Sequence, residues 1–316
     1  MTRRPLRLDV LLTELALADR FWQSLDQRVL PEMFFYWFPL SVRAWVTLCR
    51  DGKYRNYVRS DALIQRHAKQ MVAHLSGKQI DVISLGAGQG TKDLHVLEAL
   101  LGTGRQGTYR PVDSGQMLLE MACEQALEHG VSAHGLKADI TDPAHLSALE
   151  PGPHESPRLV MMVGNTLGAF DPFLMLRRLR PLVRKDDVLV IDSELGHDDA
   201  TRAGYEHPSN RAFAFAPLCS IGLTETDGTL MFHLSNDVIP GMHRLEKSFR
   251  LHDDRTLHVG GEQLQFKAGD CIHMNHSGKF ERSTFLSLLT QAGFEVIDEY
   301  LSEDCRFLMV AARPAS

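Results

Sequence analysis

The sequence is poor in the features that mark several protein classes. Its 316 residues include five cysteines, an odd number, scattered too widely to form a metal pair or a disulfide framework. No apolar run approaches the roughly 20 residues that a membrane-spanning helix needs. Residues 1–5 also lack the apolar start of a signal peptide. We therefore expect reduced thiols, a cytoplasmic location and no membrane partner.

The chain also lacks a basic excess and internal repeats. Its net charge of −6 argues against general nucleic-acid binding, which usually requires a basic face. His273 and His276 are spaced like metal ligands, but no third ligand accompanies them, so we expect no metal site. The expected partner is a small-molecule substrate, and the sequence leaves the oligomeric state open.

The strongest positive signal lies in residues 81–92. An apolar run containing β-branched residues ends on Gly86-Ala87-Gly88-Gln89-Gly90, and a helical pattern follows at once. Glycine tolerates a positive φ and lets a ligand lie against bare main chain, while the helix start offers unpaired N–H groups. This stretch predicts a strand, a tight turn and a helix that bind a nucleoside.

Asp113 strengthens this prediction, because it closes the next apolar strand, where an acid can accept hydrogen bonds from both ribose hydroxyls. Thr91 stands where the dinucleotide fingerprint has its third glycine. The spacing is instead the one that class I methyltransferases use for S-adenosylmethionine. A nicotinamide-dependent oxidoreductase and a purely structural turn are the alternatives.

From residue 79 to residue 193, strand and helix patterns alternate strictly. We expect strands at 80–85, 108–113, 131–137, 158–163 and 187–192, with helices at 91–101, 115–128, 143–149 and 171–183. Such alternation predicts an α/β fold with a parallel sheet whose ligands bind at the carboxyl ends of the strands. Those ends carry Gly86 to Gly88, Asp113, Asp139, Gly164-Asn165-Thr166 and 192–194.

The flanking regions predict a second, substrate-side part. Residues 6–75 read as helices, and segments 230–234, 244–251, 256–259 and 264–266 read as an antiparallel insert. A helix that ends at Gly293 and strands at 295–300 and 305–311 complete a seven-stranded, mostly parallel, Rossmann-like sheet. The expected divisions are an N-terminal helical segment (1–76), a cofactor-binding core (77–195), an insert (196–278) and the last helix and strand pair of the core (279–316).

Several motifs together resemble one family, the histidine-specific methyltransferases of the ergothioneine pathway and their relatives. The resemblance covers nearly the whole chain. It rests on residues 85–92, 111–113, 203–206, 230–234 and 276–280, and above all on Val163-Gly-Asn-Thr-Leu-Gly-Ala-Phe-Asp-Pro172. It implies a class I methyltransferase that uses S-adenosylmethionine and releases S-adenosylhomocysteine.

The resemblance also assigns candidate residues. The cofactor residues would be Gly86, Ala87, Gly88, Lys92, Asp113, Ser114, Asp139, Ile140, Gly164, Asn165 and Thr166. The substrate residues would be Tyr54, Tyr57, Ala169, Tyr205, Met231, Asn275 and Ser277, with Tyr205 and Tyr57 as catalytic candidates.

Two positions depart from the family pattern. Ala169 replaces an asparagine that helps to hold the substrate amino acid, and Asn275 stands where the family has an acid that pairs with the imidazole. We therefore expect a small amino acid or amine-like acceptor other than histidine. A non-catalytic accessory protein that binds the cofactor is a further alternative. Glu194, after the fifth expected strand, reads as a solvated acid.

Overall fold

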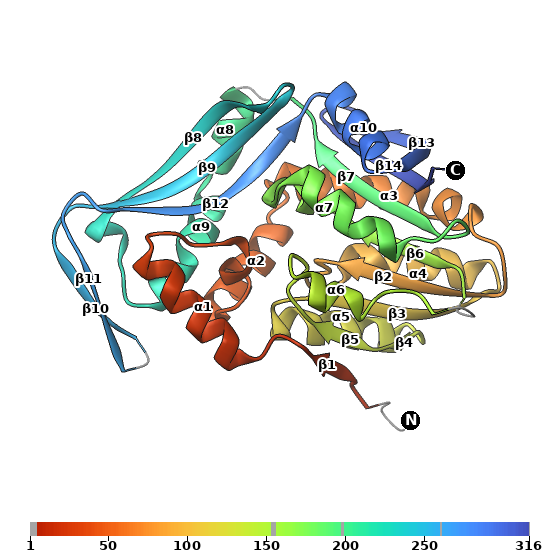
Figure 1. Cartoon of the computed structure of the whole chain (residues 1–316), viewed down its shortest axis with the longest axis horizontal. Helices are drawn as coiled ribbons and strands as arrows, with labels where there is room; N and C mark the ends of the chain where they lie inside the picture. The colour runs from red at the N-terminus through yellow and green to blue at the C-terminus, as the bar shows by residue number, and fades with distance from the viewer. Residues whose placement is uncertain (1–4, 153–155, 197–198, 260, 316) are drawn as a thin grey trace.

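The computed structural model describes residues 5–152, 156–196, 199–259 and 261–315. Figure 1 shows a large twisted sheet with helices on both faces at the right, and a long antiparallel sheet with its own helices at the left. The N-terminal helices lie between these two parts. The molecule is an α/β protein.

The core sheet has the strand order β1-β5-β3-β2-β6-β7-β14-β13, with β4 beside β3. Only β14 runs antiparallel to its two neighbours, β7 and β13. From β2, the chain first builds the sheet on one side through β3 to β5 and then continues on the other side with β6 and β7. The strand order therefore reverses between β2 and β6. The bounds are β1 Leu8–Val10, β2 Gln79–Leu85, β3 Gln106–Asp113, β4 Ser132–Ala133, β5 Gly135–Lys137, β6 Arg158–Met162, β7 Val188–Glu194, β13 Phe294–Leu301 and β14 Phe307–Pro314.

Helices cover both faces of this sheet, because alternate strand residues point to opposite sides. Ile83 and Leu85 pack with α6, α7 and α10, whereas Val82 packs with α3, α4 and α5. The bounds are α3 Arg55–Ala73, α4 Thr91–Gly102, α5 Gln116–Glu128, α6 Pro143–Ser147, α7 Pro172–Leu179 with η3 Arg180–Leu182, and α10 Arg282–Gln291. Among the described residues, no helix combines the length and apolar character that a bilayer crossing requires.

The N-terminal region is not wholly helical, which corrects one expectation. It contains α1 Glu14–Asp26, η1 Glu32–Phe35 and α2 Pro39–Arg50, but residues 8–10 form β1, parallel to β5. Three residues are too few to show a period, and the pairing depends on the open edge of a strand far along the chain. The expected strand at 131–137 also divides at His134. Within the described residues, the sheet therefore has nine strands rather than seven.

The second part is a three-stranded antiparallel sheet in the order β12-β9-β8, with a separate β10–β11 hairpin. Its core packs the N-terminal aromatic cluster, including Phe34 and Phe35, against Phe213 of α9. The elements are α8 Asp199–Tyr205, α9 Pro208–Ser220, η4 Glu225–Asp227, β8 Gly228–Ile239, β9 Met242–Leu251, β10 Arg255–Val259, β11 Glu262–Phe266 and β12 Cys271–Phe280.

Strand β12 was not expected, and it runs past the predicted boundary at residue 278. Its segment, Cys-Ile-His-Met-Asn-His-Ser-Gly-Lys-Phe, shows no strict apolar alternation because many of its polar side chains point inward. Its pairing with β9 decides the structure here.

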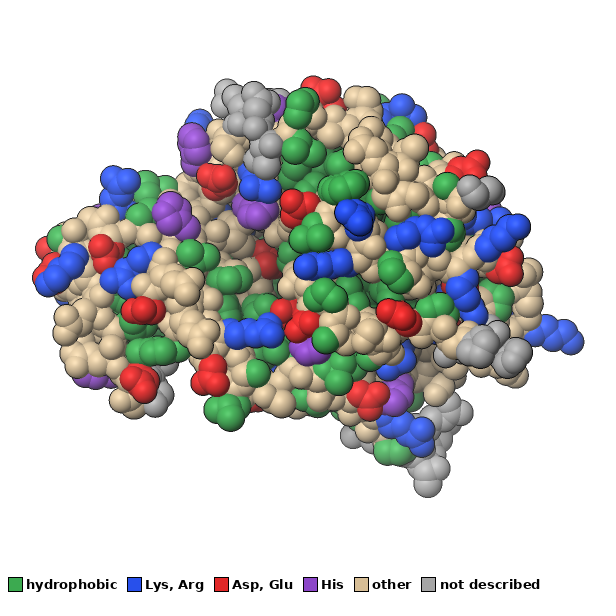
Figure 2. Space-filling model, in the orientation of Figure 1, with side chains coloured by type: hydrophobic (Ala, Val, Ile, Leu, Met, Phe, Trp, Pro, Cys, Tyr) green, Lys and Arg blue, Asp and Glu red, His purple; other side chains and the backbone are tan. Residues whose placement is uncertain are grey.

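In the face visible in Figure 2, the described lysines and arginines are interspersed with acids rather than gathered into one stripe.

The insert meets the core where two glycines touch. A Cβ on Gly168 of η2 (Thr166–Ala169) would lie 2.9 Å from the carbonyl oxygen of Gly278, and one on Gly278 would lie 3.1 Å from Cα of Gly168. The first distance is shorter than real Cβ contacts, and the second is tighter than nearly all of them. Glycine at both positions therefore allows β12 to approach the core this closely.

We expect Gly168→Ala to lower the free energy of unfolding by about 1–3 kcal/mol, because the added methyl overpacks against backbone. Urea denaturation measures this change. Gly102→Ala is the matched control, since a Cβ at Gly102 meets nothing within 4 Å at the end of α4. Equal stability of the two variants would show that the Gly168 contact relaxes without cost.

Candidate active site

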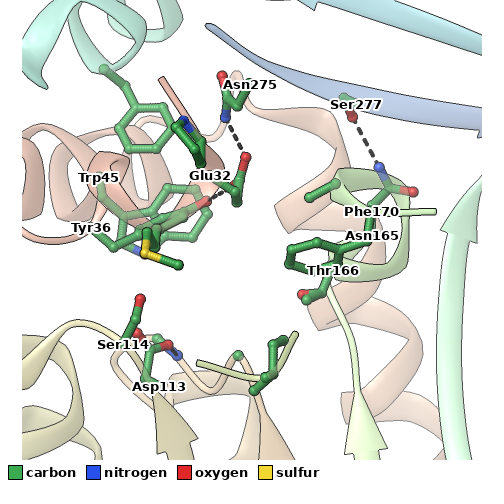
Figure 3. A pocket seen from close by; sticks show the side chains of 18 of the residues that line it. Glu32, Tyr36, Trp45, Asp113, Ser114, Asn165, Thr166, Phe170, Asn275 and Ser277 are labelled. Atoms are coloured by element: carbon green, nitrogen blue, oxygen red, sulfur yellow. Dashed lines mark hydrogen bonds between the residues drawn. The ribbon is translucent and has the colours of Figure 1, made fainter. Parts of the chain in front are cut away.

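A pocket of about 410 Å³ lies between the carboxyl ends of the core strands and strand β12 (Figure 3). One end, which we call the glycine-loop half, is lined by Gly86 to Lys92, Asp113, Ser114 and 138–141. The other end, the β12 half, is lined by Glu32, Met33, Tyr36, Tyr54, Tyr205, Phe213, Lys247 and 274–277. Residues 163–166 with Ala169 and Phe170 form the wall shared by both halves. The pocket therefore lies at the edge where the strand order reverses.

The glycine turn has the conformation that its sequence predicts. Gly88 has a φ of 56°, in the left-handed region, and lines the pocket, so its missing side chain leaves the main chain open to a ligand. Gly90 has a different reason to be glycine. Its Cβ would lie 2.8 Å from Cβ of Ala122, so it permits the packing of α4 against α5.

Asp113 holds the two turns around it. Its carboxylate accepts one hydrogen bond from N–H of Gly88 and one from N–H of Gly115, each at 2.8 Å. Burial raises the pKa of Asp113, and these backbone donors oppose the rise. A carboxylate has about four acceptor positions and Asp113 lines the pocket, so this buried acid can also accept from the hydroxyls of a ribose.

Lys92 lies at the wall between the two halves. Its ammonium group is 5.3 Å from the ring centroid of Tyr57, and it occupies the space that a side chain at Gly164 would fill. The turn at Gly164 is fixed by Asp192, whose carboxylate accepts hydrogen bonds from N–H of Gly164 and of Asn165 at 2.9 and 2.7 Å. Asp113 thus fixes the turn at Gly88 and Asp192 fixes the turn at Gly164, both at the edge where the strand order reverses.

Asp139 joins the pocket to the N-terminal helix. One oxygen forms a 2.7 Å ion pair with Arg20 of α1, and the other accepts a hydrogen bond from N–H of Thr141. Asp139 and Ile140 line the glycine-loop half. The contact with Arg20 was not expected, because nothing in the local pattern of α1 marks this arginine.

A buried polar network faces the β12 half. Lys279 is fully buried and donates to the hydroxyls of Tyr205 and Ser277 at 2.8 and 2.7 Å. It also forms a 2.5 Å ion pair with Glu194, which accepts a further hydrogen bond from Asn56. Glu194 is only 5 % exposed, so the expectation of a solvated acid is wrong. Sequence showed its place after a strand but not its buried partner.

The predicted tyrosines separate into two places. Tyr54 lies at 6.4 Å, edge to face, from Tyr205 on the β12 side, whereas Tyr57 lies beside Lys92. Burial raises the pKa of Tyr205 well above its ordinary value, and that of Tyr57 to about 12. Both phenols therefore stay protonated at neutral pH. They can donate and accept hydrogen bonds but cannot serve as phenolate bases.

Asn275 does not leave the pocket without an acid. Its amide nitrogen donates to the carboxylate of Glu32, and its oxygen accepts from the ammonium of Lys247 at 2.9 Å. Glu32 lines the pocket from η1 (Figure 3). Sequence reasoning missed both charged residues, because each lies on an element distant in the chain.

Most predicted site residues come together here. Met231 is the exception: it lies on β8 opposite Ser248, outside the pocket lining. The other predicted residues of both sites line the pocket, including Ser114, Asn165, Thr166, Ala169, Tyr54, Tyr57 and Ser277. The side chain of Asn165 faces away from the glycine-loop half. It donates to Ser277 and accepts from N–H of Glu194.

Comparison with known proteins decides the class. The family of histidine-specific, S-adenosylmethionine-dependent methyltransferases matches residues 17–314. The chain belongs to this family. The nicotinamide-dependent alternative and the non-catalytic one are therefore wrong. The protein is an S-adenosylmethionine-dependent methyltransferase whose glycine turn and buried Asp113 fit that cofactor.

Individual relatives are more distant. The N-methyltransferase fsqC of Aspergillus fumigatus is 25% identical over 295 residues, which cover 88% of this chain and 78% of that protein. Among solved structures, a 1,6-didemethyltoxoflavin-N1-methyltransferase of Burkholderia thailandensis aligns over 88% of each chain with 13% identity and a TM-score of 0.46. An S-adenosylmethionine-dependent methyltransferase of Clostridium acetobutylicum aligns over 82% of this chain and 92% of that chain, with 11% identity and a TM-score of 0.45.

We expect Asp113→Ala to weaken S-adenosylmethionine binding by about 2–4 kcal/mol, because charge-assisted hydrogen bonds and the anchor of the Gly88 turn are both lost. Isothermal titration calorimetry measures the affinity. Glu303→Gln, at an exposed acid away from the pocket, is the control. Unchanged affinity in Asp113→Ala would refute this placement of the ribose.

His276 predicts a pH dependence of stability. Burial, with Arg244, Lys247 and Lys279 nearby, lowers its pKa from the ordinary 6.5 to about 4. The folded protein therefore keeps this histidine neutral. The contribution of neutral His276 to the free energy of unfolding is complete above pH 6.5. It is lost as the pH falls from 6.5 toward 4, because in that range only the unfolded chain takes up the proton.

We expect His276→Asn to remove this part of the acid dependence. Between pH 7.5 and 4, the wild type should lose on the order of 2–3 kcal/mol more unfolding free energy than the variant. Urea denaturation at several pH values measures both. His258→Asn, on the exposed side of β10, should follow the wild type. Parallel curves for wild type and His276→Asn would contradict the assignment.

Proposed function

We propose that this methyltransferase acts on a nitrogen atom of a small-molecule amine, and that histidine is not its preferred acceptor. The observation that carries the proposal is the pair of hydroxyls of Tyr205 and Ser277, which line the pocket and are held by the buried Lys279. An amine can both donate to and accept from such hydroxyls. The name of the relative fsqC, an N-methyltransferase, also supports a nitrogen acceptor.

The residues of the glycine-loop half would hold the cofactor, which supplies an activated methyl group when bound. We assign Asp113 to the ribose, Asp139 and Ile140 to the base end, and Gly86 and Lys92 to the amino acid end. Ala87, Gly88, Ser114, Gly164 and Thr166 would complete this surface. The protein then needs chiefly to align the acceptor with the methyl group.

The acceptor nitrogen must be neutral when its lone pair attacks the methyl carbon and the carbon–sulfur bond breaks. The buried ammonium of Lys279 lies against the hydroxyls that would touch it. Glu194 balances this ammonium, so the network offers no net negative charge that would hold the amine in its protonated form. Tyr205 and Ser277 orient the nitrogen through hydrogen bonds. Its surplus proton leaves by way of these hydroxyls or water.

Ala169 argues against histidine as the preferred acceptor. It lines the shared wall with a methyl group where the family has an amide that helps to hold the amino acid. A site that lacks such a partner gives up the discrimination which that hydrogen bond provides. Acceptors without an α-carboxylate thus become competitive.

The test is methyl transfer to a panel of amines, with and without an α-carboxylate, and with histidine included. Mass spectrometry of the products with fragmentation locates the methyl group. We expect N-methylated products, with histidine among the slow substrates and accelerated by Ala169→Asn. Efficient methylation of histidine by the wild type, or methylation confined to oxygen or sulfur, would overturn the proposal.

We expect Tyr205→Phe to lower kcat/KM by about 10- to 100-fold, because one hydroxyl that orients the acceptor is lost. S-adenosylmethionine affinity should stay unchanged, since Tyr205 lies in the β12 half. Tyr300→Phe is the matched control, because Tyr300 is buried in the core outside the pocket and bonds only Asp298. A Tyr205→Phe enzyme with full activity would remove Tyr205 from the site.

A further inference from the structure

We propose that Glu32 recognises the far end of the acceptor, and that the acceptor is an aromatic amine whose ring bears a neutral N–H or O–H donor. This inference rests on the proposed function and deepens it. In this chain, the acid that the family places on β12 has its counterpart on η1. The Glu32 carboxylate, Asn275 and Lys247 together form what we call the ring-end group.

Glu32 is held at the pocket from two sides. The hydroxyl of Tyr36 donates to Oε1 at 2.9 Å, and the amide nitrogen of Asn275 donates to Oε2. Figure 3 shows the carboxylate between these two donors at the edge of the cavity. A carboxylate has about four acceptor positions, and two are used. The remaining lone pairs can accept a hydrogen bond from a ligand.

A β-bulge sets this arrangement. His273 pairs with Ser248 and His276 with Glu246, so Met274 and Asn275 together oppose Lys247. A bulge of this kind re-aims a side chain, and here the Asn275 amide points to both Glu32 and Lys247. Lysine can only donate and a carboxylate can only accept, which fixes the amide orientation. Asn275 therefore positions Glu32 and is not itself free for the acceptor.

An aromatic wall runs along the pocket between the two polar ends of the β12 half, and its middle member, Trp45, also faces the glycine turn, because a Cβ on Gly88 would lie 3.6 Å from its Nε1. Tyr36, Trp45 and Phe213 contact one another with centroid distances of 5.3 to 5.6 Å. The series of ring contacts continues from Trp45 to Tyr54, with centroids 5.9 Å apart, and from Tyr54 to Tyr205, with centroids 6.4 Å apart. All five rings line the pocket. A flat ring fits such a wall, and aromatic pairs favour these offset and edge-on contacts.

The ends of the wall define the two ends of the acceptor. Tyr36 bonds Glu32, and Tyr205 bonds Ser277, so each terminal tyrosine belongs to one polar group. Asn275 and Ser277 are two residues apart on β12, a spacing of about 7 Å. One molecule with an amine at the Tyr205 end and a ring donor at the Glu32 end can therefore touch both groups.

Charge favours a neutral donor over a cationic one. Lys247 is buried, and its ammonium lies against Asn275, next to Glu32. Burial and Lys279 lower its pKa, Glu32 raises it, and the result is about 8. Lys247 is therefore mostly charged at pH 7 and already balances Glu32. The pair therefore offers a second cation no net attraction to offset its desolvation, whereas a phenol or ring N–H can donate to the free lone pairs of Glu32 without bringing a charge.

The test measures binding to the S-adenosylhomocysteine-loaded enzyme by calorimetry, so the result does not depend on turnover. Tyramine and phenethylamine differ only in the ring hydroxyl, and tyrosine and phenylalanine form a second such pair. We expect the hydroxylated member to bind on the order of 10-fold more tightly to the wild type. Glu32→Gln should reduce this preference to near unity in both pairs.

Lys247→Met tests the charge argument. It should strengthen binding of a phenethylamine that carries a cationic aminomethyl group on the ring by about 10-fold or more, because the ammonium that balances Glu32 is gone. Glu32→Asp, which withdraws the carboxylate, is the second variant if Glu32→Gln fails to fold. Asp19→Asn, at an exposed acid of α1, is the control. S-adenosylhomocysteine affinity should stay unchanged in every variant.

The outcomes separate this inference from the proposed function. N-methylated products from any wild-type reaction support the function, whatever Glu32 does. A hydroxyl preference that persists in both Glu32 variants, or that the wild type lacks, overturns the inference. Binding of neither member of either pair also overturns it. A Glu32-dependent preference without N-methylation would support the ring-end group and reject the proposed reaction.

Discussion

The acceptor side of this protein depends on how closely β12 approaches η2. Gly168 and Gly278 touch without side chains, and this contact places Ser277 against Asn165 and Tyr205. Backbone-to-backbone contact leaves little room for adjustment, because protein interiors are close-packed. The two halves of the pocket are therefore held in one geometry. Met242 and Phe280, which pack in the hydrophobic core of the large sheet, join the insert to the core beside this contact.

Buried charge is the second organising feature. Lys279 with Glu194, and Lys247 with Glu32 through Asn275, place two ammonium groups and two carboxylates around one small cavity. Buried ion pairs add little net stability, since desolvation offsets their attraction. Here they orient the side chains around them: Lys279 holds the hydroxyls of Tyr205 and Ser277, and Lys247 holds Asn275. Removing one partner would leave the other charge buried and unpaired, which is far more costly than removing a surface pair.

The proposed function assigns different roles to the two halves of the pocket. The glycine turn, Asp113 and Asp139 would hold S-adenosylmethionine, while Ala169 and Asn275, the departures from the family pattern, would alter the acceptor side. Asn275 is neutral, but Glu32 brings a carboxylate to the same pocket from another element. Loss of a residue type at one position therefore says little about the charge of a site until the neighbours in space are known.

The sequence by itself determined the core. Local periods predicted the order of strands and helices, and the glycine triplet with Asp113 located one end of the pocket, because these signals are contained in short stretches. It could not determine β1, β12 or the β-bulge at Asn275, which depend on pairing with distant strands. Nor could it show that Glu194 is buried or that Glu32 meets Asn275. Such contacts join residues far apart in the chain, and only tertiary packing decides which of them meet.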